Sequence, residues 1–360
     1  MPEVAEVAHV VSLLKKSIIG SKILKITGAD DLIIQTPLTF TGTIKKVGRH
    51  GKYFWITVDE GKKVGHLIMH LGMTGMVKIE GVNSHMVFME NAKISVDNEE
   101  IIVNGDSIKS KTETKSKYFK DSDKSKLQQA FEEAEIKKEV EMEEEVKEPT
   151  EQWPPKYTKF EITLDTHRLA FTDPRRLGRV RYLPQLFEIE PLSLQGPDYS
   201  KNKIDPDPTI YKPIPTFEEF KAIVIKRNKP IKALLLDQKV FAGVGNWVSD
   251  EICYRSRIHP GSNFHKFENE EILFDLYDSI LSVCQQAVAI EGDIKQMEGW
   301  LMLYRWGKGK KKQPKINGES IKFETIGGRT ACFVPSQKYY TNKSKIITNG
   351  KKSGSDKRKY

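Results

Sequence analysis

Val240-Phe-Ala-Gly-Val-Gly-Asn246 joins two stretches of the sequence, 231–238 and 246–256, in which apolar residues recur with helical spacing. A helix, a glycine-rich turn and a second helix form a DNA-binding architecture when the turn faces a phosphate. Free N–H groups at a helix N-terminus bind anions, and Asn246 could cap this helix or direct its amide at a phosphate. Glycines are common in tight turns, so this interpretation depends on the rest of the chain.

Helical periodicity also covers residues 217–227 and 266–290, and a proline-rich connector, 184–215, precedes all of these segments. We therefore expect a domain boundary in the connector and a helical domain over residues 216–305.

The N-terminal part, residues 1–183, has a different pattern. An apolar stripe over residues 4–16 predicts one helix, which Gly20 ends. Short β-rich runs separated by glycines then predict a β-sandwich or barrel. The expected strands are 22–27, 32–35, 42–47, 53–58, 65–70, 76–80, 157–165, 167–171 and 178–183.

A charged insert interrupts this domain at residues 105–150. Residues 131–150 hold nine Glu and three Lys, a net charge of 3 − 9 = −6. Such a segment buries too little apolar surface to fold alone, so we expect a disordered insert, helical at most over 126–147. It is either a spacer or an interaction segment.

The C-terminal end contains two strand-like runs, 320–325 and 330–334, around Ile326-Gly-Gly-Arg329, which predicts a β-hairpin in the unit 306–340. The tail, 341–360, has seven Lys or Arg and one Asp, a net charge of 7 − 1 = +6. We expect it to be disordered and either to attract phosphates or to direct nuclear import.

The composition limits the function. Lys and Arg (58) exceed Asp and Glu (49), and the net charge of +9 suggests a polyanionic partner, either nucleic acid or a membrane surface. Cys253, Cys284 and Cys332 form no C-x-x-C pair, which argues against a four-cysteine zinc site and a disulfide framework. Since no apolar run approaches ~18 residues and no signal peptide is evident, we expect an intracellular protein without a membrane span.

Pro2 and Glu3 are candidates for chemistry. If Met1 is removed, Pro2 carries a free secondary amine, and an unperturbed α-amine titrates near ~8, so a useful fraction is neutral at pH 7. Such amines form Schiff bases with carbonyl-like carbons, and Glu3 is an adjacent acid. Alternatively, Pro and Glu simply suit the first turn of a helix.

Separated segments of the chain resemble, in the same order, the formamidopyrimidine-DNA glycosylases (the Fpg/Nei group of base-excision repair enzymes). The matching segments are Pro2-Glu-Val-Ala-Glu-Val7, His50-Gly-Lys-Tyr53, His70-Leu-Gly-Met-Thr-Gly75, Thr172-Asp-Pro-Arg-Arg-Leu-Gly178, Gly243-Val-Gly-Asn246 with Ile258-His-Pro260, and Gly327-Gly-Arg-Thr330. The stretch that runs from Leu234–Gln238 to Arg257–Pro260 resembles the plant and fungal branch of the family most. The resemblance implies an α+β fold, with an N-terminal helix plus β-sandwich and a C-terminal helix–two-turn–helix domain carrying a zincless β-hairpin finger.

The same resemblance implies a bifunctional DNA glycosylase and AP lyase that needs no cofactor or metal. Pro2 would attack C1′ of a flipped-out damaged nucleotide, with Glu3 as acid and base around the opening sugar. Lys52 would position phosphate and assist elimination, and Arg329 would support the second elimination. Glu6 matches a supporting Glu of the family.

Two further groups of residues correspond to family positions that contact DNA. Met73, Arg175 and Leu177 match residues that fill the void left by the flipped base, although Leu177 replaces the usual Phe. Without the resemblance, Met73 would be taken for a core residue and Arg175 for a surface cation. The expected phosphate contacts are His70, Lys232 and Asn246 and, with poorer local matches, Tyr157 and Arg227.

The expected partner is damaged double-stranded DNA, bound by a nuclear monomer that removes formamidopyrimidines or hydantoins and cleaves the strand by β,δ-elimination. Ala5 and Ala8 replace the usual Pro and Glu of the family, and neither position supplies a group that the chemistry requires. Two alternatives stay open: a catalytically inactive nucleic-acid-binding module on the same scaffold, and an interaction protein that uses the acidic insert and the basic tail.

Overall fold

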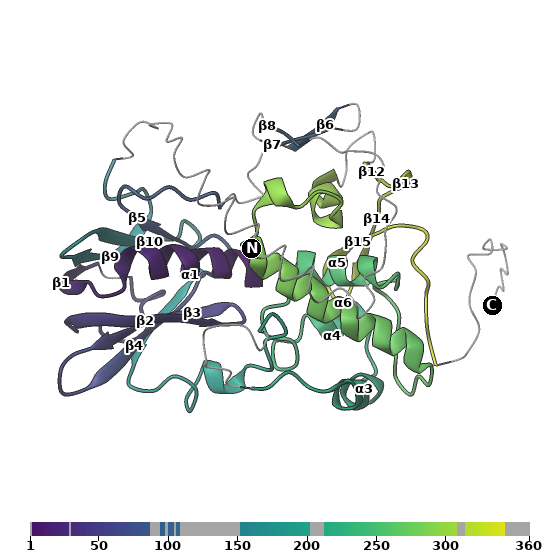
Figure 1. The fold of residues 1–360 in the computed structure, drawn as a ribbon, viewed down its shortest axis with the longest axis horizontal. Coiled ribbons are helices and arrows are strands. Elements are labelled where there is room, and N and C mark those ends of the chain that lie inside the picture. Colours follow the sequence, from purple (N-terminus) through teal and green to yellow (C-terminus); the bar gives the residue numbers. More distant parts are fainter. Residues whose placement is uncertain are drawn as a thin grey trace, which may run out of the picture.

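The computed structural model describes residues 2–28, 30–86, 94–97, 100–103, 106–108, 152–201, 212–307 and 314–342. Figure 1 shows a strand-rich N-terminal part on the left and a helical part on the right, with the N-terminus between them. Most of the expected insert and the tail from residue 343 lie outside the described residues.

The N-terminal part is a helix packed against one continuous antiparallel sheet. Helix α1 (Val4–Ile18) buries the apolar stripe that the sequence predicted. The eight strands lie in the order β11 (Arg179–Leu183), β4 (Val64–His70), β3 (Tyr53–Asp59), β2 (Gly42–His50), β1 (Lys22–Thr27), β9 (Thr158–Leu164), β10 (Arg168–Thr172) and β5 (Met76–Ile79).

The sheet folds over a shared core. In Figure 1, β9, β10 and β5 lie on one side of α1, and β2, β3 and β4 lie on the other. Strand β1 joins the two halves, and its pairing with β9 is interrupted by an irregularity between Ile23 and Lys25. Phe54 and Phe171, from opposite halves, belong to the same buried cluster as Leu14 of α1. The expected mixed fold with an N-terminal helix is therefore confirmed.

The expected strand at 32–35 is wrong. The Asp30 carbonyl accepts hydrogen bonds from the N–H groups of Ile33 and Ile34, which closes a turn, and only an isolated bridge joins Ile34 to Val180. The sequence also did not predict a separate three-stranded sheet, whose last strand falls within the expected insert. Its strands are β6 (Ile94–Asp97), β7 (Glu100–Val103) and β8 (Asp106–Ile108).

The helical part agrees closely with the predicted segments. Its α-helices are α3 (Phe217–Ile225), α4 (Ile231–Leu235), α5 (Asn246–Arg255) and α6 (Glu270–Ala289), and its 3-10 turns include η3 (Ile294–Gln296) and η4 (Leu301–Gly307). Thr216 and Asn269 cap α3 and α6 with their side chains, so α6 begins four residues later than its apolar pattern suggested. A second core surrounds α6 and includes Val4 and Ala5 of α1.

The expected β-hairpin is present. Strands β14 (Lys322–Ile326) and β15 (Arg329–Phe333) are joined by Gly327 and Gly328, which both have positive φ, as a two-residue hairpin turn requires. Two short strands, β12 (Lys315–Ile316) and β13 (Glu319–Ser320), precede it.

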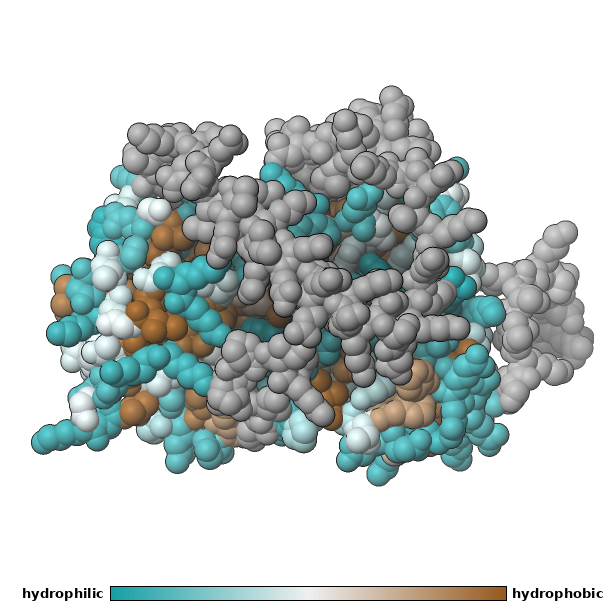
Figure 2. All heavy atoms as spheres, in the orientation of Figure 1, coloured by the Kyte–Doolittle hydropathy of each residue, from teal (hydrophilic) through white to brown (hydrophobic). Residues whose placement is uncertain are grey.

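The surface agrees with the basic, polar composition. Figure 2 shows a mostly hydrophilic face, with hydrophobic residues gathered over the sheet-bearing part. Within the described parts of the chain, none of the helices has the length and apolar character needed to cross a bilayer.

Candidate active site

The first turn of α1 lies against the N-terminus of α5. The Glu3 carboxylate accepts hydrogen bonds from the backbone N–H groups of Trp247 (3.0 Å) and Val248 (3.1 Å). These are N–H groups that no helical carbonyl satisfies, and the helix dipole favours a negative charge beside them. Glu3 therefore caps α5 from a distant part of the chain, next to the buried Pro2.

Close backbone approach makes this contact possible. The N–H of Val4 donates to the carbonyl of Gly243 (3.2 Å). A Cβ atom on Gly245 would lie 2.1 Å from the carboxyl carbon of Glu3, so a side chain there would occupy the same space. Of the two alternatives for Asn246, capping of α5 is wrong, because Gly245 is the cap residue and Glu3 supplies the acceptor.

Glu6 is a second carboxyl group in this contact. Its oxygens accept hydrogen bonds from the backbone N–H of Glu3 (2.9 Å) and from the indole N–H of Trp247 (3.1 Å). Burial and the nearby charge of Glu3 raise the pKa of Glu6 to about 7. The carboxyl group of Glu6 therefore changes protonation near neutral pH.

Lys52 lies in the tight turn between β2 and β3, which packs against the glycine-rich turn before α5. A Cβ atom on Gly51 would lie 2.8 Å from the backbone nitrogen of Gly243. The ammonium of Lys52 is buried and donates to the carbonyl of Val244 (3.0 Å). Burial lowers its pKa, the charges of Glu3 and Glu6 oppose that shift, and the charge of Arg329 adds to it.

The connector holds the Lys52 turn in place. Asp198 accepts hydrogen bonds from the N–H of Gly51 (2.8 Å) and from the guanidinium of Arg49 (2.8 Å), and all three groups are buried. Although burial opposes its ionisation, the charges of Arg49 and His50 lower the pKa of Asp198 to about 2. Sequence patterns did not indicate this anchor, because Asp198 is one of three Asp residues in the proline-rich connector and has no distinctive spacing.

His70 lies at the end of β4, within electrostatic range of Lys52. Its Nδ1 accepts a hydrogen bond from the N–H of Gly72 (3.0 Å), which leaves the proton on Nε2. Burial and the charge of Lys52 lower the pKa of His70 to about 4. The ring is therefore a neutral donor at neutral pH.

Asp173 organises the two loops that carry the expected void-filling residues. Its buried carboxylate accepts hydrogen bonds from the Thr74 hydroxyl (2.7 Å) and from the N–H groups of Arg175 (3.1 Å), Leu177 (2.7 Å) and Gly178 (2.7 Å). The segment Thr172–Gly178 was recognised in the sequence, but no role was given to this residue.

The residues expected to fill the void lie on neighbouring loops. A Cβ atom on Gly72 would lie 2.5 Å from the carbonyl carbon of Leu177, so the loop before Met73 directly contacts the second loop. Arg175 and Leu177 are exposed at the tip, and Met73 is half-buried. Tyr157 is also near this loop, because its carbonyl accepts the N–H of Asp173 (3.1 Å), and its ring is exposed.

Asn246 and Lys232 meet at the first turn of α5. The side-chain oxygen of Asn246 is buried and has no hydrogen-bond partner among the residues that the structure describes, so it can accept from a ligand or water. Lys232 donates to the Asn246 carbonyl (3.1 Å) and contacts Asp250, and its side chain is fully buried. In this arrangement the ammonium of Lys232 supports the turn from inside rather than facing an external phosphate.

The hairpin places Arg329 at an exposed tip above α4. A Cβ atom on Gly327 would lie 2.6 Å from the Cβ of Ala233, which brings the hairpin turn against that helix. Asp250 of α5 accepts from the N–H of Cys332 (3.1 Å) and also pairs with Arg305, so a buried ionic group attaches the hairpin to the helical part.

Among the described contacts, none links Arg227 to the other candidate site residues. Its guanidinium donates to the carbonyl of Ile223 (2.8 Å) in the last turn of α3. We use the name catalytic cluster for Glu3, Glu6, Lys52, His70 and Arg329, which are candidate site residues that contacts or electrostatic effects link to one another.

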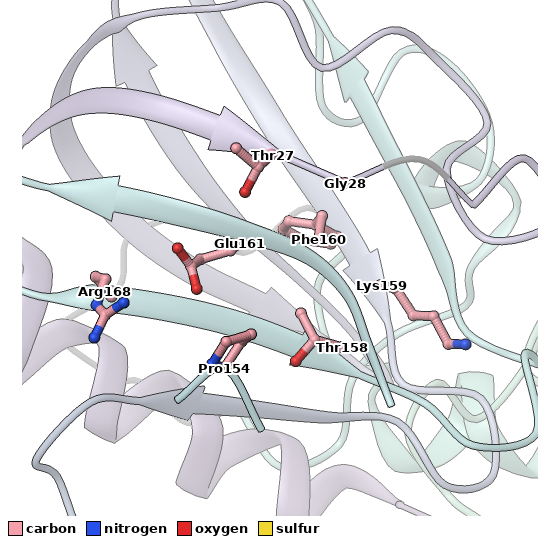
Figure 3. Close-up of a pocket in the computed structure, with 8 residues that line it drawn as sticks. All are labelled: Thr27, Gly28, Pro154, Thr158, Lys159, Phe160, Glu161 and Arg168. Atoms are coloured by element: carbon pink, nitrogen blue, oxygen red, sulfur yellow. The ribbon is translucent and has the colours of Figure 1, made fainter. Parts of the chain in front are cut away.

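A separate open pocket lies on β1, β9 and β10 (Figure 3). Its volume is about 270 Å³. None of the catalytic cluster lines it, and two of its polar side chains are already engaged: Arg168 with Glu80, and Glu161 with the indole of Trp153. We therefore assign no chemistry to it.

Family comparisons agree with this geometry. Residues 1–180 match the model described as the formamidopyrimidine-DNA glycosylase N-terminal domain, and residues 204–298 match the formamidopyrimidine-DNA glycosylase H2TH domain. A formamidopyrimidine-DNA glycosylase of Arabidopsis thaliana is 29% identical over 350 residues, covering 94% of this chain and 72% of that protein.

Solved structures show the same fold. A Lactococcus lactis formamidopyrimidine-DNA glycosylase, non-covalently bound to DNA containing an AP site, has a TM-score of 0.59 at 19% identity, covering 92% of this chain and 98% of that one. The MutM (Fpg) protein of Thermus thermophilus has a TM-score of 0.59 at 21% identity, covering 93% of this chain and 98% of that one.

Proposed function

Since the chain belongs to the formamidopyrimidine-DNA glycosylase family, we propose that it is a bifunctional enzyme that excises damaged bases from duplex DNA and then cleaves the abasic strand. The proposal rests on one observation: the Glu3 carboxylate is hydrogen-bonded to the N-terminus of α5, next to Pro2 and within electrostatic range of Lys52.

In the proposed reaction, the Pro2 amine, freed by removal of Met1, attacks C1′ of the damaged nucleotide. The glycosidic bond breaks, the base leaves with a proton, and Glu3 assists proton transfer as the sugar ring opens. The resulting Schiff base acidifies the C2′ proton, so that loss of this proton expels the 3′ phosphate. This first elimination breaks the strand. A second elimination expels the 5′ phosphate, and hydrolysis of the Schiff base then releases the sugar fragment and regenerates the Pro2 amine.

The other residues of the proposed site would hold the DNA. Lys52, His70 and Arg329 offer donors to phosphates around the reacting sugar, and the unpaired oxygen of Asn246 can accept from a water bound there. Met73, Arg175 and Leu177 would enter the duplex where the damaged nucleotide leaves it.

The proposed substrates are formamidopyrimidines and other oxidised or ring-opened bases. Among the similar structures, one of the Lactococcus lactis protein contains DNA with an abasic site and another contains DNA with Fapy-dG. We propose that this chain likewise binds damaged duplex DNA, as a monomer. Nuclear location, through the basic tail, is a separate proposal that a reporter fusion with and without residues 341–360 would test.

Borohydride trapping tests the chemistry. Protein with a free Pro2 amine should form a covalent adduct with a DNA duplex that contains an abasic site, because borohydride reduces the Schiff base to a stable amine. Chain that keeps an N-terminal extension should bind the same duplex without forming the adduct. Equal trapping by both forms would overturn the assignment of Pro2, and binding without trapping by either form would favour an inactive binding module.

A further inference from the structure

Outside the catalytic cluster, three metal-binding side chains converge from distant parts of the sequence. His9 lies in α1, His85 in the segment that follows β5, and Glu291 directly after α6. One donor atom from each lies within 4.8 Å of the others. We propose that these three residues bind a divalent transition-metal ion, best matched by Zn²⁺, which ties α1 to the end of α6.

The donor set fits such an ion. Two imidazoles and one carboxylate are a common three-residue set for zinc, with the fourth position left for water. The Nδ1 of His9 lies 3.0 Å from a carboxylate oxygen of Glu291. Two atoms at that separation can both bond to one ion at the usual distance of about 2 Å. The ring of His85 already lies against that of His9, with the ring centroids 3.8 Å apart, and its Nε2 is 3.3 Å from the backbone carbonyl of Glu291.

The surroundings of His9 also fit. His9 is buried, and its Nε2 lies 2.8 Å from the hydroxyl oxygen of Ser84. When Nδ1 binds a metal, Nε2 carries the proton and donates it to such an acceptor, which fixes the orientation of the ring. Ser84 therefore takes the position of an outer partner that orients a metal-binding histidine.

The location defines what the ion would do. Gly292, next to Glu291, packs against α1, since a Cβ atom there would lie 3.4 Å from the Cβ of Ala5. An ion held between His9 and Glu291 would join the helix that begins at the catalytic residues to the core around α6. The expectation of no metal rested on the scattered cysteines and on the family resemblance, and positions 9, 85 and 291 form no recognisable spacing that would have indicated this site.

Zinc binding by the whole chain tests this proposal. The purified protein is stripped with chelator, equilibrated with Zn²⁺, freed of excess metal and measured by elemental analysis and thermal unfolding. We expect about one zinc per chain and a rise in unfolding temperature, because an ion that binds only the folded state stabilises it. His85→Ala should lose both effects while folding normally, since that residue is exposed, and His9→Ala should lose them too.

Two controls make the result specific. His66→Ala removes a histidine of β4 outside the proposed site and should retain the zinc and the thermal shift. Ser84→Ala should weaken zinc binding by roughly 10-fold or more, as expected for an outer partner. Absence of a zinc-dependent thermal shift in the wild type, or the same zinc content in His85→Ala, would overturn the proposal. Borohydride trapping by stripped protein should persist in every case, which separates this site from the catalytic one.

Discussion

The carboxyl group of Glu3 occupies the space that a side chain on residue 245 would need, because a Cβ atom on Gly245 would lie 2.1 Å from its carboxyl carbon. Gly245 has a φ of −121°, which any residue can adopt, so the requirement for glycine comes from space and not from backbone strain. The proposed acid of the site and the glycine-rich turn thus position each other.

Gly245→Ala should reduce base excision strongly although it removes no reactive group. The added methyl group has to displace Glu3 from the N–H groups of Trp247 and Val248. Excision of an oxidised base would be measured beside circular dichroism. Gly299→Ala is a control for destabilisation alone: a Cβ atom there meets nothing within 4 Å, but the φ of +75° strains alanine, so stability should fall while excision is retained. Full activity of Gly245→Ala would show that the position of Glu3 is unimportant.

Glu3→Gln should separate the two proposed reactions. Base release needs proton transfer and should fall by roughly 10²–10⁴-fold, the usual effect of losing a general acid or base. Cleavage at a preformed abasic site should remain, because the Pro2 amine is intact. Rates on the two substrates would be compared in single-turnover assays, and equal losses on both would contradict this division.

The pH dependence of stability should include a contribution from Glu6. Its pKa is about 7 in the folded chain against 4.5 for an ordinary Glu, so the folded state holds this proton more tightly. The contribution is present in full below pH 4.5 and is lost as pH rises to about 7, by up to about 3 kcal/mol in the free energy of unfolding. Glu6→Gln should be less sensitive to pH across this window in urea titrations. Identical pH profiles for the two proteins would rule the effect out.

Asp173→Asn should destabilise the loop that carries Arg175 and Leu177. The amide group replaces an oxygen that accepts N–H donors, and each lost bond to the carboxylate costs about 1.5–3 kcal/mol. We expect lower stability and lower excision, whereas Arg175→Ala, at an exposed tip, should lower excision alone. Urea unfolding with activity assays distinguishes them, and unchanged stability of Asp173→Asn would refute the anchoring role.

Arg329 and Asn246 should differ in how they respond to salt. Arg329→Ala should weaken binding of lesion-bearing duplex and lower its salt dependence by roughly one phosphate contact. Asn246→Ala changes no charge and should weaken binding with nearly the same dependence. Binding across a salt series measures both effects. If Arg329→Ala alters neither affinity nor salt dependence, the hairpin only covers the helical part.

The sequence by itself determined the elements with strong local patterns. The apolar stripe of α1, the alternating strands and the helical period of residues 217–290 each reflect burial of one face, which is a local property. Short motifs also identified Pro2, Glu3, Lys52 and Arg329 as candidates. The prediction of a strand at 32–35 was wrong because the apolar residues there resemble a strand, whereas the Asp30 carbonyl closes a turn.

Only the tertiary structure decided how those candidates are held. Four contacts join residues that have no fixed separation in the chain. They are Glu3 with the N-terminus of α5, Asp173 with the loop that carries Arg175 and Leu177, Asp198 with Gly51, and His9 with Glu291. The burial of Lys232 was hidden for the same reason. Hydrogen bonding and electrostatic shifts depend on distances across the folded core, and local sequence patterns do not contain those distances.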